Sequence, residues 1–172
     1  MFTQIEVLEK LKKIIEEATD DLLLENGMIN NGKYELVKPV VNIGYVPPKK
    51  LAFEGYTVPG VTLYIKEGEE TEDEFDKINV LIGIQTYDPG NTIVSDEKSN
   101  TEYTLEGYKD ILNVIQRIRR KLNNMSELDG LLIKKPLKWG FFDEQLYPYW
   151  AGYINLNIDI CRIRRTELSK YL

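Results

Sequence analysis

The chain has 172 residues, enough for one domain with a hydrophobic core, and its net charge of −6 gives no general attraction to DNA or to anionic lipid. It contains no histidine, which excludes histidine-ligated zinc, histidine acid–base catalysis and nucleophile–histidine pairs. With one cysteine and no apolar run near the roughly 20 residues of a membrane helix, it is expected to occur in the cytoplasm, or in a particle assembled there, with no membrane contact.

The N-terminal residues predict an amphipathic helix. Thr3 and Glu6 have the spacing of a capping box, and apolar residues recur at helical intervals as far as Leu22. The pair Asn26-Gly27 is the expected stop, because both residue types tolerate the left-handed conformation that ends many helices.

Strands are predicted after this helix. Residues 34–46 have strand character that Pro39 interrupts, and the proline indicates a sheet edge or a bulge because it cannot donate to a β-ladder. Residues 47–60 are expected to be irregular, and residues 61–66 to form a short strand.

The middle of the chain contains an acidic run, an apolar strand and a polar segment. Seven of the ten residues 67–76 are Asp or Glu, and such a run repels itself, so we expect a mobile, solvated loop. Residues 78–87 are apolar on both alternations, which predicts a central strand covered on both faces, or by a helix on one and a partner on the other. Residues 91–103 are polar without periodicity and are expected to form a mobile loop.

A second helix is predicted from about Thr104 to Asn123. Its apolar residues recur at helical spacing and form the expected buried stripe: Tyr108, Ile111, Leu112, Ile115, Ile118 and Leu122. The basic residues within 117–121 lie at its C-terminal end, where positive charge suits the helix dipole.

The remainder is predicted to be β-structure. Residues 130–135 and 137–142 are expected strands, with a turn at 143–145. Residues 153–163 alternate most clearly, with isoleucines and a leucine on one side and polar residues on the other. A short basic tail, residues 162–172, follows.

The order helix, strands, helix, strands predicts an α+β fold. We expect a single domain over residues 1–172, with a mostly antiparallel sheet and both main helices packed on one face. A sheet of this kind leaves its second face for solvent or for a partner.

The residue patterns indicate no catalysis, metal site or cofactor. The acidic run lacks calcium-loop spacing, no glycine-rich phosphate loop is present, and Cys161 has no identifiable acid–base partner. An enzyme that used carboxylates alone would need a paired site on ordered strands, whereas these carboxylates occur mostly in runs or on helix surfaces. We therefore predict that the protein is not an enzyme.

Aromatic residues concentrate in residues 139–153. Lys134, Lys135 and Lys138 precede them, and aromatic rings beside lysines can form a platform for single-stranded nucleic acid. The favoured interpretation is a hairpin that packs its rings on a sheet and a neighbour, because an acidic chain binds nucleic acid poorly once salt screens the lysines.

Charge is segregated along the chain, with acid in residues 67–76 and base in residues 117–121 and 162–170. Identical copies placed head to tail would bring opposite patches together around a ring, and the polar side of strand 153–163 suits a wet interface. The candidate interface residues come from these patches and from the aromatic stretch: Tyr149, Trp150, Tyr153, Asn155, Asn157, Asp159, Glu70, Asp73, Arg117, Arg120, Arg162 and Arg165.

Four features occur in a recognisable order: the N-terminal helix, the strand excursion near residues 41–48, the second helix, and the run Tyr147-Pro148-Tyr149-Trp150-Ala151-Gly152-Tyr153 before an alternating strand. This layout resembles the tail terminator (tail completion) proteins of long-tailed bacteriophages and of phage-tail-like bacteriocins. It covers most of the chain and is sharpest across residues 137–160.

The resemblance implies a structural protein that forms a hexameric ring at the head-proximal end of a tail tube. Such a ring would cap the tube, fix its length with the ruler protein and face the head connector. The implied partners are other copies, the tail tube protein, and sheath and head-connector proteins, with DNA only passing through the lumen. The implied location is a virion or phage-tail-like particle assembled in the bacterial host cytoplasm.

Two alternatives stay open. Other phage neck proteins, including head-closure proteins, share this general layout. A small nucleic-acid-binding module that uses the lysines and aromatic residues of 134–153 is the alternative from a different class.

Overall fold

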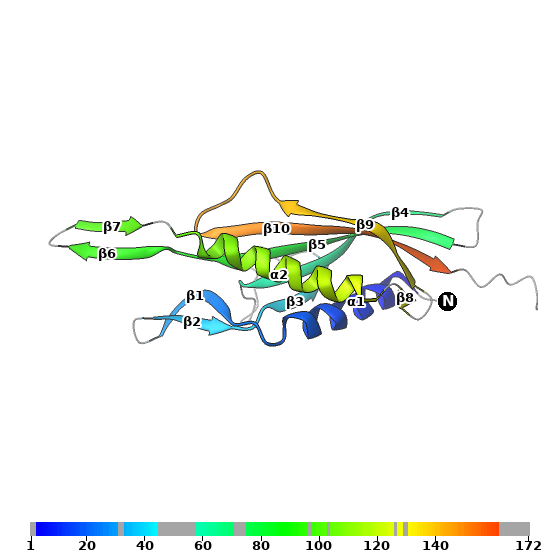
Figure 1. Ribbon diagram of the computed structural model, residues 1–172, viewed down its shortest axis with the longest axis horizontal. Coiled ribbons are helices and arrows are strands. Elements are labelled where there is room, and N and C mark those ends of the chain that lie inside the picture. Colours follow the sequence, from blue (N-terminus) through cyan, green and yellow to red (C-terminus); the bar gives the residue numbers. More distant parts are fainter. Residues whose placement is uncertain are drawn as a thin grey trace, which may run out of the picture.

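The computed structural model describes residues 3–30, 33–44, 58–70, 75–95, 98–102, 104–125, 127–128 and 131–161. Within these residues the chain forms a six-stranded sheet, two two-stranded sheets and two helices (Figure 1). The elements are, in chain order, α1 (Gln4–Thr19), β1 (Leu24–Asn30), β2 (Lys33–Val37), β3 (Val40–Ile43), β4 (Gly60–Glu69), β5 (Phe75–Tyr87), β6 (Asn91–Ser95), β7 (Lys98–Glu102), α2 (Glu106–Asn123), β8 (Glu127–Leu128), β9 (Leu131–Phe141) and β10 (Tyr149–Cys161).

The six-stranded sheet has the order β3-β4-β5-β10-β9-β8. Its neighbouring strands are antiparallel except for the parallel pair β3–β4, so the predicted α+β fold with a mostly antiparallel sheet is confirmed. The centre is the pair β5–β10, which runs in unbroken register from Tyr149 opposite Tyr87 to Cys161 opposite Phe75. Pro39 lies between β2 and β3, and β3 is the edge strand that the proline predicted.

One alternation of each central strand forms the core. These residues are buried and apolar: Ile78, Val80, Ile82 and Ile84 of β5, and Ile154, Leu156, Ile158 and Ile160 of β10. Helix α2 contacts β5, β9 and β10, and α1 contacts β3 and β4, so both helices cover the same face, as predicted (Figure 1). The other alternation of β5 is only half-buried, so the interpretation that this strand is covered on both faces is wrong for the described residues.

Helix α1 has the capping box that its sequence predicts. The Glu6 amide donates to Thr3 Oγ1 at 3.3 Å, and the Thr3 amide donates to Glu6 Oε2 at 2.6 Å. The predicted stop is wrong, because the helix already ends at Thr19. Gly27, with φ +78°, lies instead at an irregularity in β1, where an added Cβ would lie 3.2 Å from the Tyr87 ring. The glycine signal therefore marks a strand irregularity that admits a neighbouring ring.

The acidic run is partly strand. β4 continues to Glu69, and its acidic end pairs with β5, with Glu67 opposite Asn79 and Glu69 opposite Lys77. The prediction of a loop is wrong for these residues, because backbone pairing and an oppositely charged cross-strand neighbour offset the repulsion. Residues 71–74 lie outside the described residues.

The polar segment 91–103 is also mostly strand. β6 and β7 pair from Asn91 opposite Glu102 to Ser95 opposite Lys98, and the hairpin projects beyond the end of the sheet (Figure 1). The predicted loop is therefore wrong. A ladder of backbone hydrogen bonds does not require apolar side chains on either face, so side-chain periodicity carries no signal for it.

The predicted strands 130–135 and 137–142 are one strand. β9 runs from Leu131 to Phe141, and its pairing with β10 shifts register between Asn157 opposite Lys134 and Asn155 opposite Lys138. Pro136 lies within this irregularity, where the β-ladder is interrupted. The missing amide hydrogen of the proline therefore costs no ladder hydrogen bond.

The N-terminus of helix α2 is capped by a residue that lies well before the helix in the chain. Its N-cap residue, Leu105, makes no side-chain cap, and the buried carboxylate of Asp88, just after β5, takes that role. Asp88 Oδ2 accepts from the Gly107 amide at 2.9 Å and from Thr104 Oγ1 at 2.7 Å. One carboxylate therefore joins the end of β5 to the start of α2.

The buried stripe of α2 differs from the prediction in that Leu112 is only half-buried, Tyr108 is exposed and Val114 is added. Tyr108 is 39% exposed and stacks on the Phe141 ring at 4.6 Å between centroids, whereas Val114 is buried. The helix begins at Glu106 rather than Thr104, so the first predicted turn is not yet helical and Tyr108 lies near its exposed start.

Replacing Gly107 with Ala is expected to destabilise the protein, although alanine is normally the better helix former by about 1 kcal/mol. An added Cβ would lie 2.5 Å from Trp150 Nε1 and 2.7 Å from Asp88 Cβ, so the start of α2 must shift. We expect the free energy of unfolding to fall by about 1–3 kcal/mol in urea denaturation. Gln116→Ala, at an exposed position of α2, is the control and should be neutral or stabilising. An equally stable Gly107→Ala would contradict this account.

Candidate functional site

The candidate functional site is the face of the six-stranded sheet opposite α1 and α2, here called the open face. It is formed by the second alternation of the strands, which lies between the core positions: Thr62, Tyr64 and Glu67 of β4, Lys77, Asn79, Leu81, Gly83 and Gln85 of β5, Lys134 of β9, and Ala151, Tyr153, Asn155, Asn157 and Asp159 of β10. Neither helix covers it, and its described side chains other than Thr62 and Asp159 are half-buried or exposed.

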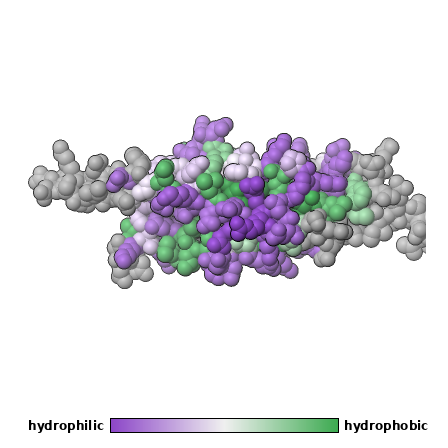
Figure 2. Space-filling view, viewed as in Figure 1, coloured by the Kyte–Doolittle hydropathy of each residue, from purple (hydrophilic) through white to green (hydrophobic). Residues whose placement is uncertain are grey.

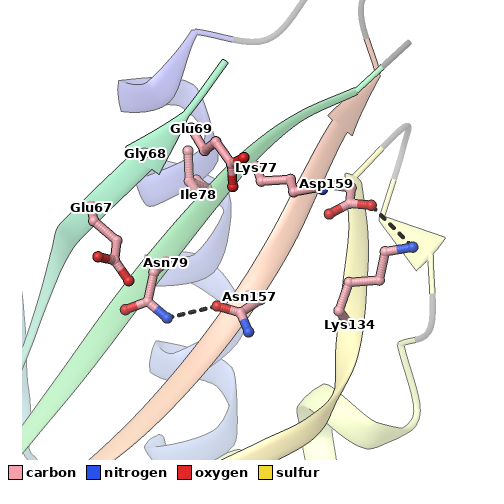
Figure 3. Close-up of a pocket in the computed structure, with 9 residues that line it drawn as sticks. All are labelled: Glu67, Gly68, Glu69, Lys77, Ile78, Asn79, Lys134, Asn157 and Asp159. Atoms are coloured by element: carbon pink, nitrogen blue, oxygen red, sulfur yellow. Dashed lines mark hydrogen bonds and ion pairs between the residues drawn. The ribbon is translucent and has the colours of Figure 1, made fainter. Parts of the chain in front are cut away.

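One end of the open face is a polar pocket (Figure 3). It has a volume of about 600 Å³, and residues of β4, β5, β9 and β10 line it. Asn79 Nδ2 donates to Asn157 Oδ1 at 2.7 Å, and Lys134 Nζ lies 3.0 Å from Asp159 Oδ2. The exposed carboxylates of Glu67 and Glu69 add negative charge to the pocket rim.

The other end of the open face is an apolar hollow of about 300 Å³. Small residues, Gly60, Gly83 and Ala151, contribute to its lining together with Leu81 and Phe142. Small side chains leave the backbone close to the surface and so leave space above it. Side chains of another protein can enter this space. Open apolar surface of this kind is typical of interaction sites.

Two hydrogen-bond acceptors on the open face have no donor among the described residues. Asn79 Oδ1 and Asn155 Oδ1 are both buried atoms without a partner. A buried polar atom left unpaired costs roughly 1–3 kcal/mol, so a rotation of either amide that brought its oxygen to a donor of a partner would gain free energy on binding.

The predicted interface residues of β10 lie together, but they are not equally accessible. Tyr153, Asn155, Asn157 and Asp159 share the open face, as their alternation predicted. Asp159 is only 7% exposed and is held by Lys134, so the expectation that it is an outward-facing polar position is wrong. The reason is the neighbouring strand, which brings a lysine over the carboxylate.

The aromatic candidates Trp150 and Tyr149 lie apart from the middle of the open face. Trp150 packs against the core, and its ring lies 6.1 Å from that of Tyr108. Tyr149 contacts Tyr87, with 5.5 Å between ring centroids. Both side chains therefore have structural neighbours within the chain.

The basic end of α2 is partly neutralised by α1. Arg117 Nη1 lies 2.5 Å from Asp21 Oδ1, and Lys121 Nζ lies 2.9 Å from Glu17 Oε2. The Arg117 guanidinium holds the pKa of Asp21 below its ordinary value. Exposed pairs of this kind are weak, so the side chains can exchange partners.

The remaining candidate interface residues come from the acidic and basic patches predicted from the sequence. Glu70 follows β4 and is exposed, and Arg120 is exposed on α2. Asp73, Arg162 and Arg165 lie outside the described residues, as does the basic tail 162–172. The mobility of residues 67–76 and 91–103 stays a prediction.

The aromatic and lysine stretch packs much of its surface within the chain. Lys135 hydrogen-bonds Asn123, and the Arg119 guanidinium lies 4.5 Å from the centre of the Trp139 ring. The predicted turn 143–145 is part of a longer loop, in which Gln145 Oε1 accepts from the Ala151 amide at 2.6 Å. Trp139, Phe142 and Tyr147 are nevertheless 40%, 42% and 47% exposed, so the hairpin interpretation and the exposed row of rings both stay predictions.

Lys134 and Asn79 are site residues that the sequence analysis did not assign to the interface, and Glu67 was assigned only as part of the acidic patch 67–76. They come from three different strands and meet only through strand pairing. No spacing along the chain could have indicated their proximity. Lys134 was noticed, but as part of a possible nucleic-acid platform.

Among the described residues, no group of acidic or sulfur-containing side chains is placed to hold a metal ion. Nor does that part of the chain contain a helix of the length and hydrophobicity needed to span a bilayer. Comparison of the sequence with known protein families and with curated proteins finds no match.

Replacing Lys134 with Met is expected to lower the free energy of unfolding by about 1–2 kcal/mol, because it leaves the buried Asp159 carboxylate without its counter-charge. Thermal or urea denaturation measures the effect. Lys138→Met, at an exposed position of the same strand, is the matched control and should change stability by no more than about 0.5 kcal/mol. Equal effects of the two substitutions would show that the pair is not important for stability.

Proposed function

We propose that this protein is a structural assembly protein that caps the end of a phage-type tail tube as a ring and joins it to the head connector. The observation that supports the proposal is the open face. A broad sheet has its core on one side only, and its other side combines an apolar hollow, a polar pocket and two unpaired buried acceptors. These properties suit a protein partner more than a small substrate.

A capping protein needs two different surfaces. One must match the end of the tube, and the other must not recruit further tube subunits, which is a requirement for specificity as well as affinity. The fold provides such an asymmetry, because the open face is a sheet surface and the opposite side is formed by two helices. The surface over these helices is largely hydrophilic (Figure 2). We assign the open face to the tube protein and the helical side to the remaining partners.

Contacts between copies are proposed to use charge. The exposed carboxylates Glu67, Glu69 and Glu70, here called the acidic tip, lie at one end of the sheet, and Arg120 is exposed on α2. A head-to-tail ring, hexameric by its resemblance to tail terminators, places unlike surfaces together. Because exposed charges are screened by salt, its association should weaken at high ionic strength.

Gln85→Lys tests the apolar end of the open face and Asn157→Lys tests the polar end. Each lysine can extend into solvent in the free protein but would block or repel a docked partner. We expect folded variants that bind the tube protein at least about tenfold more weakly in light scattering. In the producing phage or bacteriocin, electron microscopy should show overlong or headless tails.

Gln116→Lys on α2 is the control and should leave tube binding unchanged. Normal binding and normal tails with both open-face variants folded and incorporated would exclude this face as the contact. Normal tails after clean deletion of the gene would exclude the capping function. Retention of the protein on single-stranded DNA at moderate salt would instead support the nucleic-acid alternative.

A further inference from the structure

A second surface lies beside the start of α2, away from the open face. The β1–β2 hairpin, the end of β5 and the first turns of α2 enclose a groove of about 720 Å³. Apolar and acidic side chains both line it, and six of them define what we call the acidic groove: Leu23, Glu25, Ile29, Leu36, Glu106 and Asp110. Neither the sheet core nor the proposed tube contact uses this groove.

The apolar part of the acidic groove is unusually exposed for its residue types. Leu23, Ile29 and Leu36 are 57%, 67% and 56% exposed, respectively. Hydrophobic residues gather at the surface over the β1–β2 hairpin, next to the hydrophilic helices (Figure 2). Clustered exposed aliphatic side chains of this kind indicate a contact surface, because covering them releases water.

The acidic groove also has an excess of negative charge. Burial, followed by the nearby carboxylates of Glu106, Asp88 and Glu25, raises the pKa of Asp110 to about 6. Burial and Asp88 likewise raise the pKa of Glu25. Lys109 is the cation near Asp110, and it is bonded to Glu106. Like charges that are forced together in this way are relieved when a cation binds between them.

We propose that the acidic groove binds residues 162–172 of a second copy of this chain. That segment contains four basic residues, Arg162, Arg164, Arg165 and Lys170, together with the apolar residues Ile163, Leu168, Tyr171 and Leu172. It therefore combines the two properties that complement the groove. The basic residues match the carboxylates, and the apolar residues match the exposed aliphatic side chains of β1 and β2.

The distance along the sheet requires that the arginines of the segment come from another copy. Tyr149 is paired with Tyr87, which lines the groove, and Cys161 lies twelve residues further along β10, about 40 Å away at the rise of a strand. Residues 162–165 extend at most about 14 Å from Cys161. The three arginines therefore cannot reach the groove of their own chain. A head-to-tail arrangement places the end of one β10 at the groove of the next copy.

The acidic tip is the competing site for the same arginines. It lies near Cys161, because Cys161 pairs with Phe75 at the start of β5. Among the described residues of the tip and the polar pocket, however, none is an exposed large apolar side chain. The tip therefore matches the charge of the segment but not its apolar residues, which favours the groove.

The test uses the full chain and a charge exchange. The groove variant is Glu25→Lys with Glu106→Lys, the tail variant is Arg164→Glu with Arg165→Glu, and the tip variant is Glu67→Lys with Glu69→Lys. Sedimentation velocity over a concentration series measures self-association, and circular dichroism confirms folding. We expect the groove and tail variants each to associate at least about tenfold more weakly than the parent protein, and the tail variant to regain association when mixed with the groove variant but not when mixed with the tip variant.

An equimolar mixture of the groove and tail variants should restore association, because each reversed groove then meets a reversed tail. A merely destabilised variant would not be rescued in this way. Recovery of association in a mixture of the tip and tail variants, with none in the mixture of the groove and tail variants, would overturn the proposal in favour of the tip. A parent chain that stays monomeric at all concentrations would also overturn it.

A fluorescent peptide of residues 161–172 provides a second measurement. It is titrated with the full-length tail variant, whose own tail cannot compete for the groove. We expect binding that weakens as the pH falls from about 7.5 to about 5, because protonation of Asp110 removes a negative charge that favours the cation. Asp110→Asn should flatten this pH dependence. Peptide binding that survives the groove substitutions would overturn the proposal, whereas the tube-binding assay tests the capping function separately.

Discussion

The antiparallel pairing of β5 with β10 is the interaction on which the rest of the structure depends. Both strands place β-branched or leucine side chains on one alternation, and burial of each contributes roughly 1.5–3 kcal/mol. A slip of one residue would move one of these rows to the open face, so the register is strongly determined. The helices pack on the resulting apolar face, and the polar pocket and apolar hollow arise on the other face from the same alternation.

The Asp88 carboxylate connects the central sheet to α2. It accepts hydrogen bonds from the start of the helix and thereby fixes the helix axis relative to the end of β5. Burial is the main reason why the pKa values of Asp110 and Glu25 are raised, and the nearby Asp88 carboxylate adds to both shifts. One group thus stabilises the fold and contributes to the charge of the acidic groove. The open face and the acidic groove are separate surfaces, which is what a protein with contacts to both tube and neighbouring copies requires.

Local physics made several features predictable from the sequence. The capping box at Thr3 and the apolar periods of both helices depend on neighbours within a few residues, and the structure confirms them. The alternation of Tyr153, Asn155 and Asn157 against isoleucines likewise placed them on one face before any pairing was known. The antiparallel α+β class followed from the order of these elements.

Only the tertiary structure decided what depends on partners distant in sequence. The strand character of the acidic run and of residues 91–102 depends on backbone pairing, which side-chain periodicity does not predict. The burial of Asp159 depends on a lysine that β9 supplies, and the direction of Trp150 on space left by a glycine in α2. The acidic groove joins β1, β5 and α2, which are far apart in the chain. A sequence specifies local period and capping directly, but such juxtapositions exist only once strand register and helix packing are set.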